Sequence, residues 1–399
     1  MITCHVCRSA NLKPLVDFGP QALSNRFLAR PDEDEAFFSF VLSQCHDCGM
    51  IQIGRPIAPK DLKPRFDWLR YNEQESHLDD VVAKARTLAP TKKDYTVGAI
   101  SFKDDTTVSR FQKAGFENTW RLDLEKDLGV SDPLAGLETI QAVLTPDMAS
   151  KISHDRSFAD LLIARHVLEH GHDTNQFLEA ISLLVKPAGH IILEVPDCEP
   201  ALQRRDYTMF WEEHILYFTP ESFQSTLLNF GFSPVLSERY IYSNENSLVA
   251  IVRRDETEKP IKKPIVASPL LEKGRAYSEA FPDIRKKIAE ALESQRGKNR
   301  KIAVFGAGHL SCAWINFLGL KDNIDFVVDD HPKKRGLFMP GSHLPILGSA
   351  ELIRQNVSLC LLTLSPESET KVVENNKAFL ENGGRFASIF PGKNNSFAT

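Results

Sequence analysis

The 399-residue chain lacks any apolar run that approaches the roughly 18 residues of a membrane-spanning helix. Its start, MITCHVC, has no basic segment followed by an apolar one, as an export signal would have. It also lacks an excess of basic residues, since its formal net charge is −5, which argues against nucleic acid or an anionic membrane as the main partner. We therefore expect a cytoplasmic protein that binds a small molecule.

Cysteine is scarce as well, and an odd number of seven speaks against a disulfide framework. Four of the cysteines form two CxxC pairs, Cys4 with Cys7 (CHVC) and Cys45 with Cys48 (CHDC). This spacing lets both sulfurs of a pair reach one ion, and four thiolates close the tetrahedral shell of Zn²⁺. The sequence therefore predicts a structural zinc site without a catalytic role. We expect the histidines inside the pairs, His5 and His46, to be exposed spacers.

The chain is too long for a single core, so we expect two or three domains. From about residue 95, short apolar runs such as TVGAIS and GHIILEV alternate with helical patterns such as DTNQFLEAISLLVK, which Asp173 can cap. This alternation is typical of parallel α/β architecture. Two strands joined by SNEN follow as an antiparallel hairpin, and a smaller α/β pattern starts at KIAVFGAGH. The predicted parts are a zinc-binding domain (1–80), a central Rossmann-type sheet (85–254), a charged helical linker (255–297) and a smaller Rossmann-like domain (298–399).

Three stretches hold residues suited to chemistry. ARHVLEHGHD follows a strand of the central sheet, at the edge where open α/β sheets bind ligands, although a solvated polar turn explains it equally well. In FWEEHILYF, an acid and His214 stand between aromatic residues, and a histidine in such a wall can be tuned to accept a proton near neutral pH. GAGHLSC, with Asp329 and Asp330 after the next strand, nearly meets the dinucleotide-binding pattern, but a purely structural bend remains an equal alternative.

Together these stretches resemble the sugar-nucleotide C-methyltransferases of deoxysugar pathways, in which a zinc domain, an S-adenosylmethionine (SAM) domain and a Rossmann-like domain follow in this order. The resemblance covers nearly the whole chain. It is most specific in CHVC, QCHDCG, VLEH, KPAGHIILEVPD, EEHILYFTPESF and VVDDHPKKRGLFMPGSHLPI. It implies that residues 85–254 form a SAM-methyltransferase-like domain, that SAM and a structural Zn²⁺ are the cofactors, and that the substrate is a keto-deoxysugar nucleotide.

The resemblance also implies roles for single residues. In such enzymes the histidine of the EH…YF motif is taken to remove a proton beside a keto group, and the enolate attacks the methyl group of SAM. Carried over, the catalytic residues are His214 as the base, Glu213 as its orienting partner and His170 facing the sugar. The residues implied for SAM are Ser101, Asp105, Asp123 and His166, with Asp123 on the ribose. Those implied for the substrate are Trp211, Tyr217, Gly306, Gly308 and His343, the last three holding the nucleotide or an interdomain contact.

The loop after the first strand of the SAM domain departs from the family pattern E-I-G-x-x-D-G. The aligned residues are AISFKDD, so Ala99 replaces the acid, and Ser101 and Asp105 replace the glycines. Glycine serves in such loops because the backbone passes close to the ligand or adopts positive φ.

Three functions therefore stay open. They are SAM-dependent C-methylation of a keto-sugar nucleotide, SAM-independent base chemistry such as epimerisation beside the ketone, and non-catalytic sugar-nucleotide or partner binding. The altered loop counts against the first, and the retained Glu213 and His214 favour the second over the third. The sugar, the nucleotide, the carbon and the oligomeric state are not fixed by the sequence.

Overall fold

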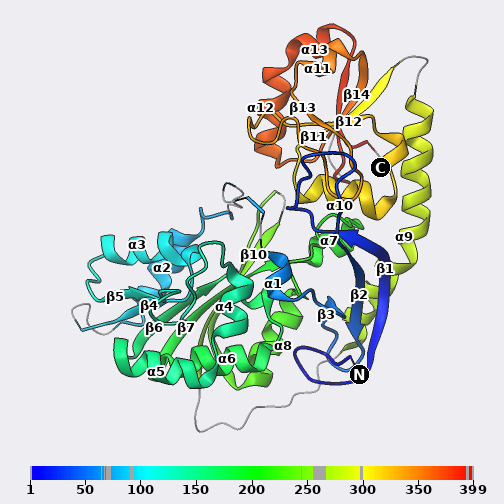
Figure 1. The fold of residues 1–399 in the computed structure, drawn as a ribbon. Coiled ribbons are helices and arrows are strands. Elements are labelled where there is room, and N and C mark those ends of the chain that lie inside the picture. The colour runs from blue at the N-terminus through cyan, green and yellow to red at the C-terminus, as the bar shows by residue number, and fades with distance from the viewer. Residues whose placement is uncertain are drawn as a thin grey trace.

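The computed structural model describes residues 2–63, 65–66, 68, 73–89, 94–243, 245–254, 267–296, 300–391 and 395–397. The described part of the chain contains three β-sheets, each at the centre of one domain (Figure 1). The α/β fold class predicted from the sequence is confirmed. None of the helices in these ranges combines the length and hydrophobicity needed to span a bilayer.

The first sheet belongs to the N-terminal domain, but one of its strands comes from far along the chain. Ile51 pairs with Tyr217 in antiparallel register, so the HILYF segment completes the sheet of the zinc-binding domain. The sequence alone did not indicate this pairing. The elements of this domain, in sheet order, are β1 (Leu12–Ala22), β2 (Phe37–Cys45), β3 (Ile51–Ile53) and β8 (Leu216–Tyr217), with helix α1 (Pro59–Leu62).

The second sheet has the order β5-β4-β6-β7-β10-β9. β4 pairs in parallel with β5 and β6, and β6 with β7, whereas β10 runs antiparallel to both β7 and β9, so the predicted closing hairpin is confirmed. Its strands are β4 (Val97–Ala99), β5 (Thr119–Arg121), β6 (Ala159–Arg165), β7 (Val185–Asp197), β9 (Phe232–Tyr240) and β10 (Asn246–Arg254). Its helices are α2 (Leu78–Arg86), η1 (Phe102–Asp104), α3 (Asp105–Lys113), α4 (Leu137–Val143), α5 (Pro146–Arg156), η2 (Leu168–His170), α6 (Thr174–Leu183), α7 (Glu199–Arg204) and α8 (Pro220–Phe230).

Local signals in the sequence set several ends of these helices. The Asp173 carboxylate accepts a hydrogen bond from the Gln176 N–H (3.0 Å) and caps α6, as expected. Gly231, with φ of 98°, ends α8, because glycine adopts this left-handed conformation without a steric penalty.

A long helix, α9 (Ala267–Gln295), lies within the predicted linker, while residues 255–266 lie outside the described residues. It runs beside the N-terminal sheet toward the C-terminal domain (Figure 1). Its Ser278 hydroxyl donates to the Leu15 carbonyl of β1 (2.6 Å), and its Arg285 side chain donates to the Leu318 carbonyl (3.1 Å). The charged segment therefore contains a helix that packs against the first and third domains.

The third sheet is fully parallel, with the order β13-β12-β11-β14-β15, as the smaller α/β pattern predicted. Its strands are β11 (Lys301–Phe305), β12 (Phe326–Val328), β13 (Ile346–Leu347), β14 (Val357–Leu362) and β15 (Arg385–Ser388). Its helices are α10 (His309–Leu318), η3 (Lys321–Asn323), α11 (Glu351–Arg354), α12 (Pro366–Asn375) and α13 (Lys377–Glu381).

Candidate active site and metal centre

The four cysteines of the two CxxC pairs come together at one point. Their sulfur atoms all lie within 4.8 Å of one another, and the Cys4–Cys48 and Cys7–Cys45 sulfur pairs are each 3.6 Å apart. A tetrahedron of thiolates about 2.3 Å from a Zn²⁺ ion has edges of about 3.8 Å. The residues present therefore fit a zinc ion. Because all four ligands are sulfur, the site supports the fold and leaves no open position for chemistry.

The first cysteine pair docks on the loop that follows His170. The His5 Nδ1–H donates to the His172 carbonyl (2.8 Å), and the Asn175 side chain donates to the Val6 carbonyl (3.1 Å). His46 is exposed, as expected, but His5 is half-buried because of this contact. The metal centre thus supports a loop of the middle domain.

Backbone bonds from two domains fix the segment that carries His214. The N–H of the next residue, Ile215, donates to the Glu169 carbonyl (2.8 Å), and the Ile215 carbonyl accepts from the Ile53 N–H (2.9 Å). The His214 N–H itself donates to the Trp211 carbonyl (3.2 Å). Since Glu169 follows β6 and Ile53 lies in β3, the middle domain and the zinc-binding domain together position His214.

The half-buried His214 ring lies among other rings and polar groups. Its centroid is 5.0 Å from that of Trp211 and 4.9 Å from that of His170, which it meets edge-on. One polar side-chain atom from each of Glu169, His170 and His214 lies within 4.8 Å of the other two. Burial, and next the positive charge of His170, lower the pKa of His214 well below its usual value. The ring is therefore neutral near pH 7 and can accept a proton.

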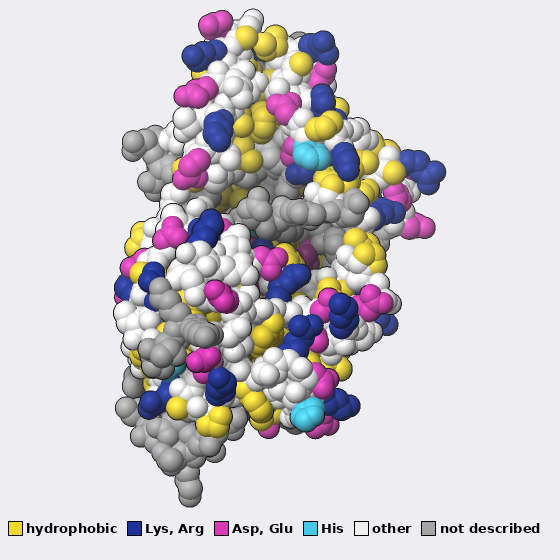
Figure 2. All heavy atoms as spheres, turned by 90° about the vertical axis from the view of Figure 1, so that its left-hand side faces the viewer, with side chains coloured by type: hydrophobic (Ala, Val, Ile, Leu, Met, Phe, Trp, Pro, Cys, Tyr) yellow, Lys and Arg dark blue, Asp and Glu magenta, His cyan; other side chains and the backbone are white. Residues whose placement is uncertain are grey.

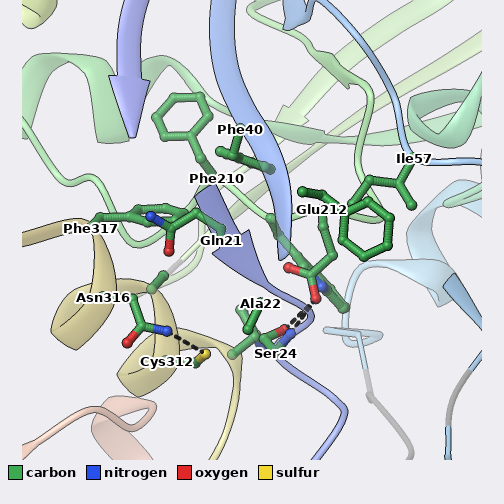
Figure 3. Close-up of a pocket in the computed structure, with 14 residues that line it drawn as sticks. Gln21, Ala22, Ser24, Phe40, Ile57, Phe210, Glu212, Cys312, Asn316 and Phe317 are labelled. Carbon is green, nitrogen blue, oxygen red and sulfur yellow. Dashed lines mark hydrogen bonds between the residues drawn. The ribbon is translucent and has the colours of Figure 1, made fainter. Parts of the chain in front are cut away.

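Two acids beside His214 bind the N-terminal domain. The N–H and hydroxyl of Ser24 donate to Glu212 Oε1 (2.5 and 2.8 Å; Figure 3), and the Asn25 side chain donates to Glu213 Oε1 (2.8 Å). Burial, followed by the carboxylates of Glu138 and Glu212, raises the pKa of Glu213 well above its usual value, so this carboxyl group can hold a proton. Its role as orienting partner of His214 stays a prediction.

The two other predicted histidines are paired with carboxylates. His170 Nδ1 lies 2.9 Å from Glu138 Oε1, and His166 lies 3.1 Å from Glu194 Oε1 and 3.4 Å from Glu169 Oε1. Burial opposes protonation of both rings, but nearby carboxylates outweigh it and raise the pKa of each histidine, Glu73 and Glu194 most for His166 and Glu138 most for His170. Sequence reasoning missed Glu138, because a single acid on helix α4 carries no signal of its own.

The C-terminal domain reaches the same site. The ring of His309, at the start of α10, stacks on Trp211 with 4.5 Å between centroids and 12° between planes. Burial lowers the pKa of His309 to about 4, so this ring is neutral. The surface is hollowed between the C-terminal domain and the domains below it (Figure 2). The predicted catalytic residues therefore lie where three domains meet.

The glycine turn before α10 is held by bonds within its own domain. Gly306 has φ of 110°, a conformation that favours glycine. The Ala307 N–H donates to Asp329 Oδ2 (3.0 Å), and the Lys334 ammonium donates to the Ala307 carbonyl (2.5 Å). In a dinucleotide site the acid after the second strand would bind the ribose, whereas Asp329 binds the turn. These bonds favour a structural bend over a nucleotide contact for Gly306 and Gly308.

Two further predicted substrate residues support their surroundings. The buried Tyr217 hydroxyl donates to the Trp211 carbonyl (2.9 Å) and accepts from the Trp211 N–H (2.9 Å). His343 contacts the N-terminal domain through the Pro31 carbonyl (2.8 Å) and Glu35 Oε2 (3.1 Å). Tyr217 therefore braces Trp211, and His343 makes the interdomain contact that was one of its two expected roles.

Known families match this chain in three consecutive parts. A zinc binding domain model matches residues 4–62, a methyltransferase domain model residues 107–237 and a C-methyltransferase C-terminal domain model residues 247–391. The three models follow one another along the chain in the order of zinc-binding, methyltransferase and C-methyltransferase C-terminal domains, so the chain is similar to C-methyltransferases in its domain order. It is 25% identical to the C-methyltransferase NovU of Streptomyces niveus over 414 aligned residues, which cover 97% of this chain and 95% of that protein.

Two solved structures that are similar to this chain each cover 46% of it. One is an O-methyltransferase family protein from Burkholderia thailandensis, with 14% identity, a TM-score of 0.30 and coverage of 46% of this chain and 57% of that one. Another is a SAM-dependent methyltransferase from Anabaena variabilis, with 14% identity, a TM-score of 0.32 and coverage of 46% and 86%. Similarity at this level says nothing further about the site.

A methyltransferase domain implies SAM as the methyl donor. The contacts of the residues predicted to hold SAM show whether these side chains are available to bind it. Asp123, two residues after β5, accepts from two backbone N–H groups of the next turn (2.8 and 3.1 Å). Asp105 pairs with Arg121 (3.3 Å), and the buried Ser101 hydroxyl accepts from a backbone N–H of its own loop (3.2 Å). His166 lies between two carboxylates, so all four residues predicted to hold SAM have partners within the protein. Ala99, which stands where the family pattern has an acid, offers no carboxylate. The residues do not fit the methionine part of SAM.

Proposed function

We propose that this protein removes a proton from a carbon atom next to the ketone of a sugar nucleotide, with His214 as the base. The observation that carries this proposal is the neutral, half-buried His214 ring where the three domains meet, beside the ring of Trp211. A C–H group beside a ketone is acidic enough for a histidine when the enolate oxygen is stabilised.

The similarity to C-methyltransferases supports this chemistry. A C-methyltransferase must first make a carbon atom nucleophilic, and removal of a proton next to a ketone does so. The keto-sugar nucleotide as substrate follows from the resemblance to the sugar-nucleotide C-methyltransferases, carried by EEHILYFTPESF and the C-terminal segment VVDDHPKKRGLFMPGSHLPI.

The charges around His214 suit an enolate. After burial, the groups that lower its pKa are cations or neighbouring histidines, among them His170, His166 and Lys103. Positive charge that disfavours protonation of the imidazole also stabilises negative charge on a substrate oxygen nearby. Trp211 and His309 cover one side of this region and limit the access of water, which strengthens these interactions.

Two fates are open to the enolate. Transfer of a methyl group from SAM is favoured by the match to the C-methyltransferase family. Return of a proton is favoured by the residues of loop 101–105, which do not fit SAM. Both begin with the same proton removal, so His214 has the same role in each.

Exchange of solvent deuterium into dTDP- and UDP-linked 4-keto-6-deoxyhexoses tests the base. His214→Ala is expected to slow the exchange by about 10²–10⁴-fold, the usual contribution of a positioned base. The control is His154→Ala, which removes an exposed histidine on α5 outside the cleft and should leave the rate unchanged. Absence of exchange by the wild type, or a His214→Ala variant as fast as the wild type, contradicts the proposal.

The pH dependence of the exchange adds a second measurement. The base acts only when it is unprotonated, and its folded-state pKa lies well below the usual value of about 6.5. The rate should therefore stay level as the pH falls from neutrality through about 6.5 and decline only below this value. A decline centred at or above about 6.5 would show that the titrating base is in a different environment.

A further inference from the structure

Three further side chains of metal-ligating type meet at the candidate active site, in addition to the four cysteines. Glu169 and His170 belong to η2, which follows β6, and His214 precedes β8. One donor atom of each lies within 4.8 Å of the other two. Ligand atoms about 2.1 Å from one ion in tetrahedral geometry lie about 3.4 Å apart. The three groups therefore need only small side-chain movements to share an ion.

The backbone holds the two segments against each other before any ion binds. The Ile215 N–H donates to the Glu169 carbonyl (2.8 Å), and the His214 N–H donates to the Trp211 carbonyl (3.2 Å). The rings of His170 and His214 meet edge-on, with 4.9 Å between their centroids. Ligands that are already in place bind an ion more tightly, because less conformational freedom is lost on binding.

The Glu169 carboxylate is buried without adequate partners. The residue is 1% exposed, and neither carboxylate oxygen accepts a hydrogen bond from the described residues. Its ion pair with His166 spans 3.4 Å between Oε1 and Nδ1, longer than the distance of about 2.7–2.9 Å in a charge-assisted hydrogen bond. A carboxylate that has lost water without gaining such bonds destabilises the fold. A metal ion would supply the missing partner.

His170 has the second contact that metal-binding histidines usually show. The residue is 3% exposed, and its Nδ1 lies 2.9 Å from Glu138 Oε1. A carboxylate on one ring nitrogen fixes the ring and makes the other nitrogen a stronger ligand. Glu138 can therefore hold the His170 ring while the other nitrogen binds an ion.

The donor set selects the kind of ion. Two imidazoles and one carboxylate suit Zn²⁺ and the neighbouring transition metals, whereas Mg²⁺ and Ca²⁺ prefer oxygen ligands. Three protein ligands leave a position for water, in contrast to the closed shell of four thiolates. His214 is only half-buried, so one ligand of the cluster stays in contact with solvent, from which an ion can arrive.

We propose that Glu169, His170 and His214 bind a divalent transition metal ion such as Zn²⁺, and that this second metal site switches the base off. A neutral imidazole has one nitrogen that can accept a proton or bind a metal ion. His214 therefore cannot hold the ion and take a proton from the substrate at the same time, and the form without the second ion is the active one. Binding of the ion stands on geometry alone, whereas the inhibition rests on the proposed role of His214.

Equilibrium dialysis against Zn²⁺ at pH 8 counts the bound ions under conditions where imidazole ligands lose their protons more readily. The wild type should bind one ion more than Glu169→Gln. His214→Ala provides a second variant, with the same expected loss, should Glu169→Gln fail to fold by circular dichroism. The control Glu179→Gln, at an exposed position of α6, should bind as many ions as the wild type.

Deuterium exchange into the same 4-keto-6-deoxyhexose nucleotides tests the inhibition. Added Zn²⁺ should stop exchange by the wild type in step with occupancy of the second site, and removal of free metal with a weak chelator should restore it. Mg²⁺ should have no effect, because it prefers oxygen ligands. In Glu138→Gln the Zn²⁺ concentration for half-inhibition should rise about 10–100-fold, the usual effect of losing the partner of a metal-bound histidine.

Each outcome decides one part of the proposal. Equal zinc counts for the wild type, Glu169→Gln and His214→Ala overturn the metal site. Exchange that is unchanged or faster when the second ion is bound overturns the inhibition. Absence of exchange by the wild type with zinc at the cysteines alone overturns the proposed base and the inhibition with it, and the zinc count still decides whether the second site exists.

Discussion

Replacement of Glu194 by glutamine tests the buried charge network beneath the candidate site. Glu194, in β7, is 1% exposed and meets Arg165 Nε (2.5 Å), His166 Nε2 (3.1 Å) and His77 Nε2 (3.0 Å). Glutamine keeps the size of the side chain but removes the charge that balances Arg165 and His166. Loss of one partner of a buried ion pair costs about 3–5 kcal/mol, so we expect the free energy of unfolding at pH 7 to fall by this amount.

Urea unfolding followed by circular dichroism measures the change. The control is Glu279→Gln on α9, where the carboxylate is 61% exposed and pairs with Arg275 at the surface, so the expected change is below about 0.5 kcal/mol. A loss for Glu194→Gln of less than about 1 kcal/mol would refute the view that the network depends on this charge.

The sign of the pH dependence follows from the pKa of Glu194. Burial alone would raise this pKa, but His166, His77 and Arg165 hold it well below the usual value. A carboxyl group with a depressed pKa contributes stability above its unfolded pKa of about 4.3 and loses it as the pH falls toward the folded value. The difference between wild type and variant should therefore hold from pH 7 to about 5 and shrink below about 4.

Two further changes test the metal centre and the central sheet. Removal of zinc, by chelation or by Cys4→Ser, should unfold the N-terminal domain and abolish deuterium exchange, because binding of a structural zinc ion contributes about 10–16 kcal/mol to folding. A metal-free protein with unchanged circular dichroism and activity contradicts this. Gly98→Ala should lower the free energy of unfolding by about 1–3 kcal/mol, because the new Cβ would lie 2.6 Å from the Trp120 ring. The control is Gly308→Ala, whose new Cβ would face open space and should have little effect. Equal midpoints of urea unfolding for the two variants contradict this.

The sequence predicted those parts of the molecule that depend on local spacing. The zinc ligands could be found because CxxC spacing lets both sulfurs of a pair reach one ion, and all four sulfurs do lie within 4.8 Å of one another. The helix ends at Asp173 and Gly231 follow from single residues acting on neighbouring backbone groups. The alternation of strands and helices is likewise a local pattern. Such features need no knowledge of what packs against them.

The partners of the site residues could not be predicted in this way. Glu213 binds Asn25, which is 188 positions away in the sequence, and His170 meets Glu138 from another helix. The two residues of β8 are too few to show a strand pattern, and their pairing with β3 depends on the docking of the zinc-binding domain. Glu213 is next to His214 in the sequence, but in the fold its carboxylate binds the Asn25 side chain of the N-terminal domain.

Loop 101–105 shows most clearly where sequence reasoning stops. The sequence shows that the two glycines of the family pattern are replaced in this loop, but it does not show what the loop can bind instead. The answer depends on groups that only the fold brings together, namely the Glu73 carboxylate on the Lys103 ammonium and the Arg165 guanidinium under the loop backbone. The Asp104 carboxylate also accepts from the N–H groups of Ile100 and Ser101 (3.0 and 2.8 Å), so the altered loop pairs its backbone groups within the protein instead of presenting them to a ligand.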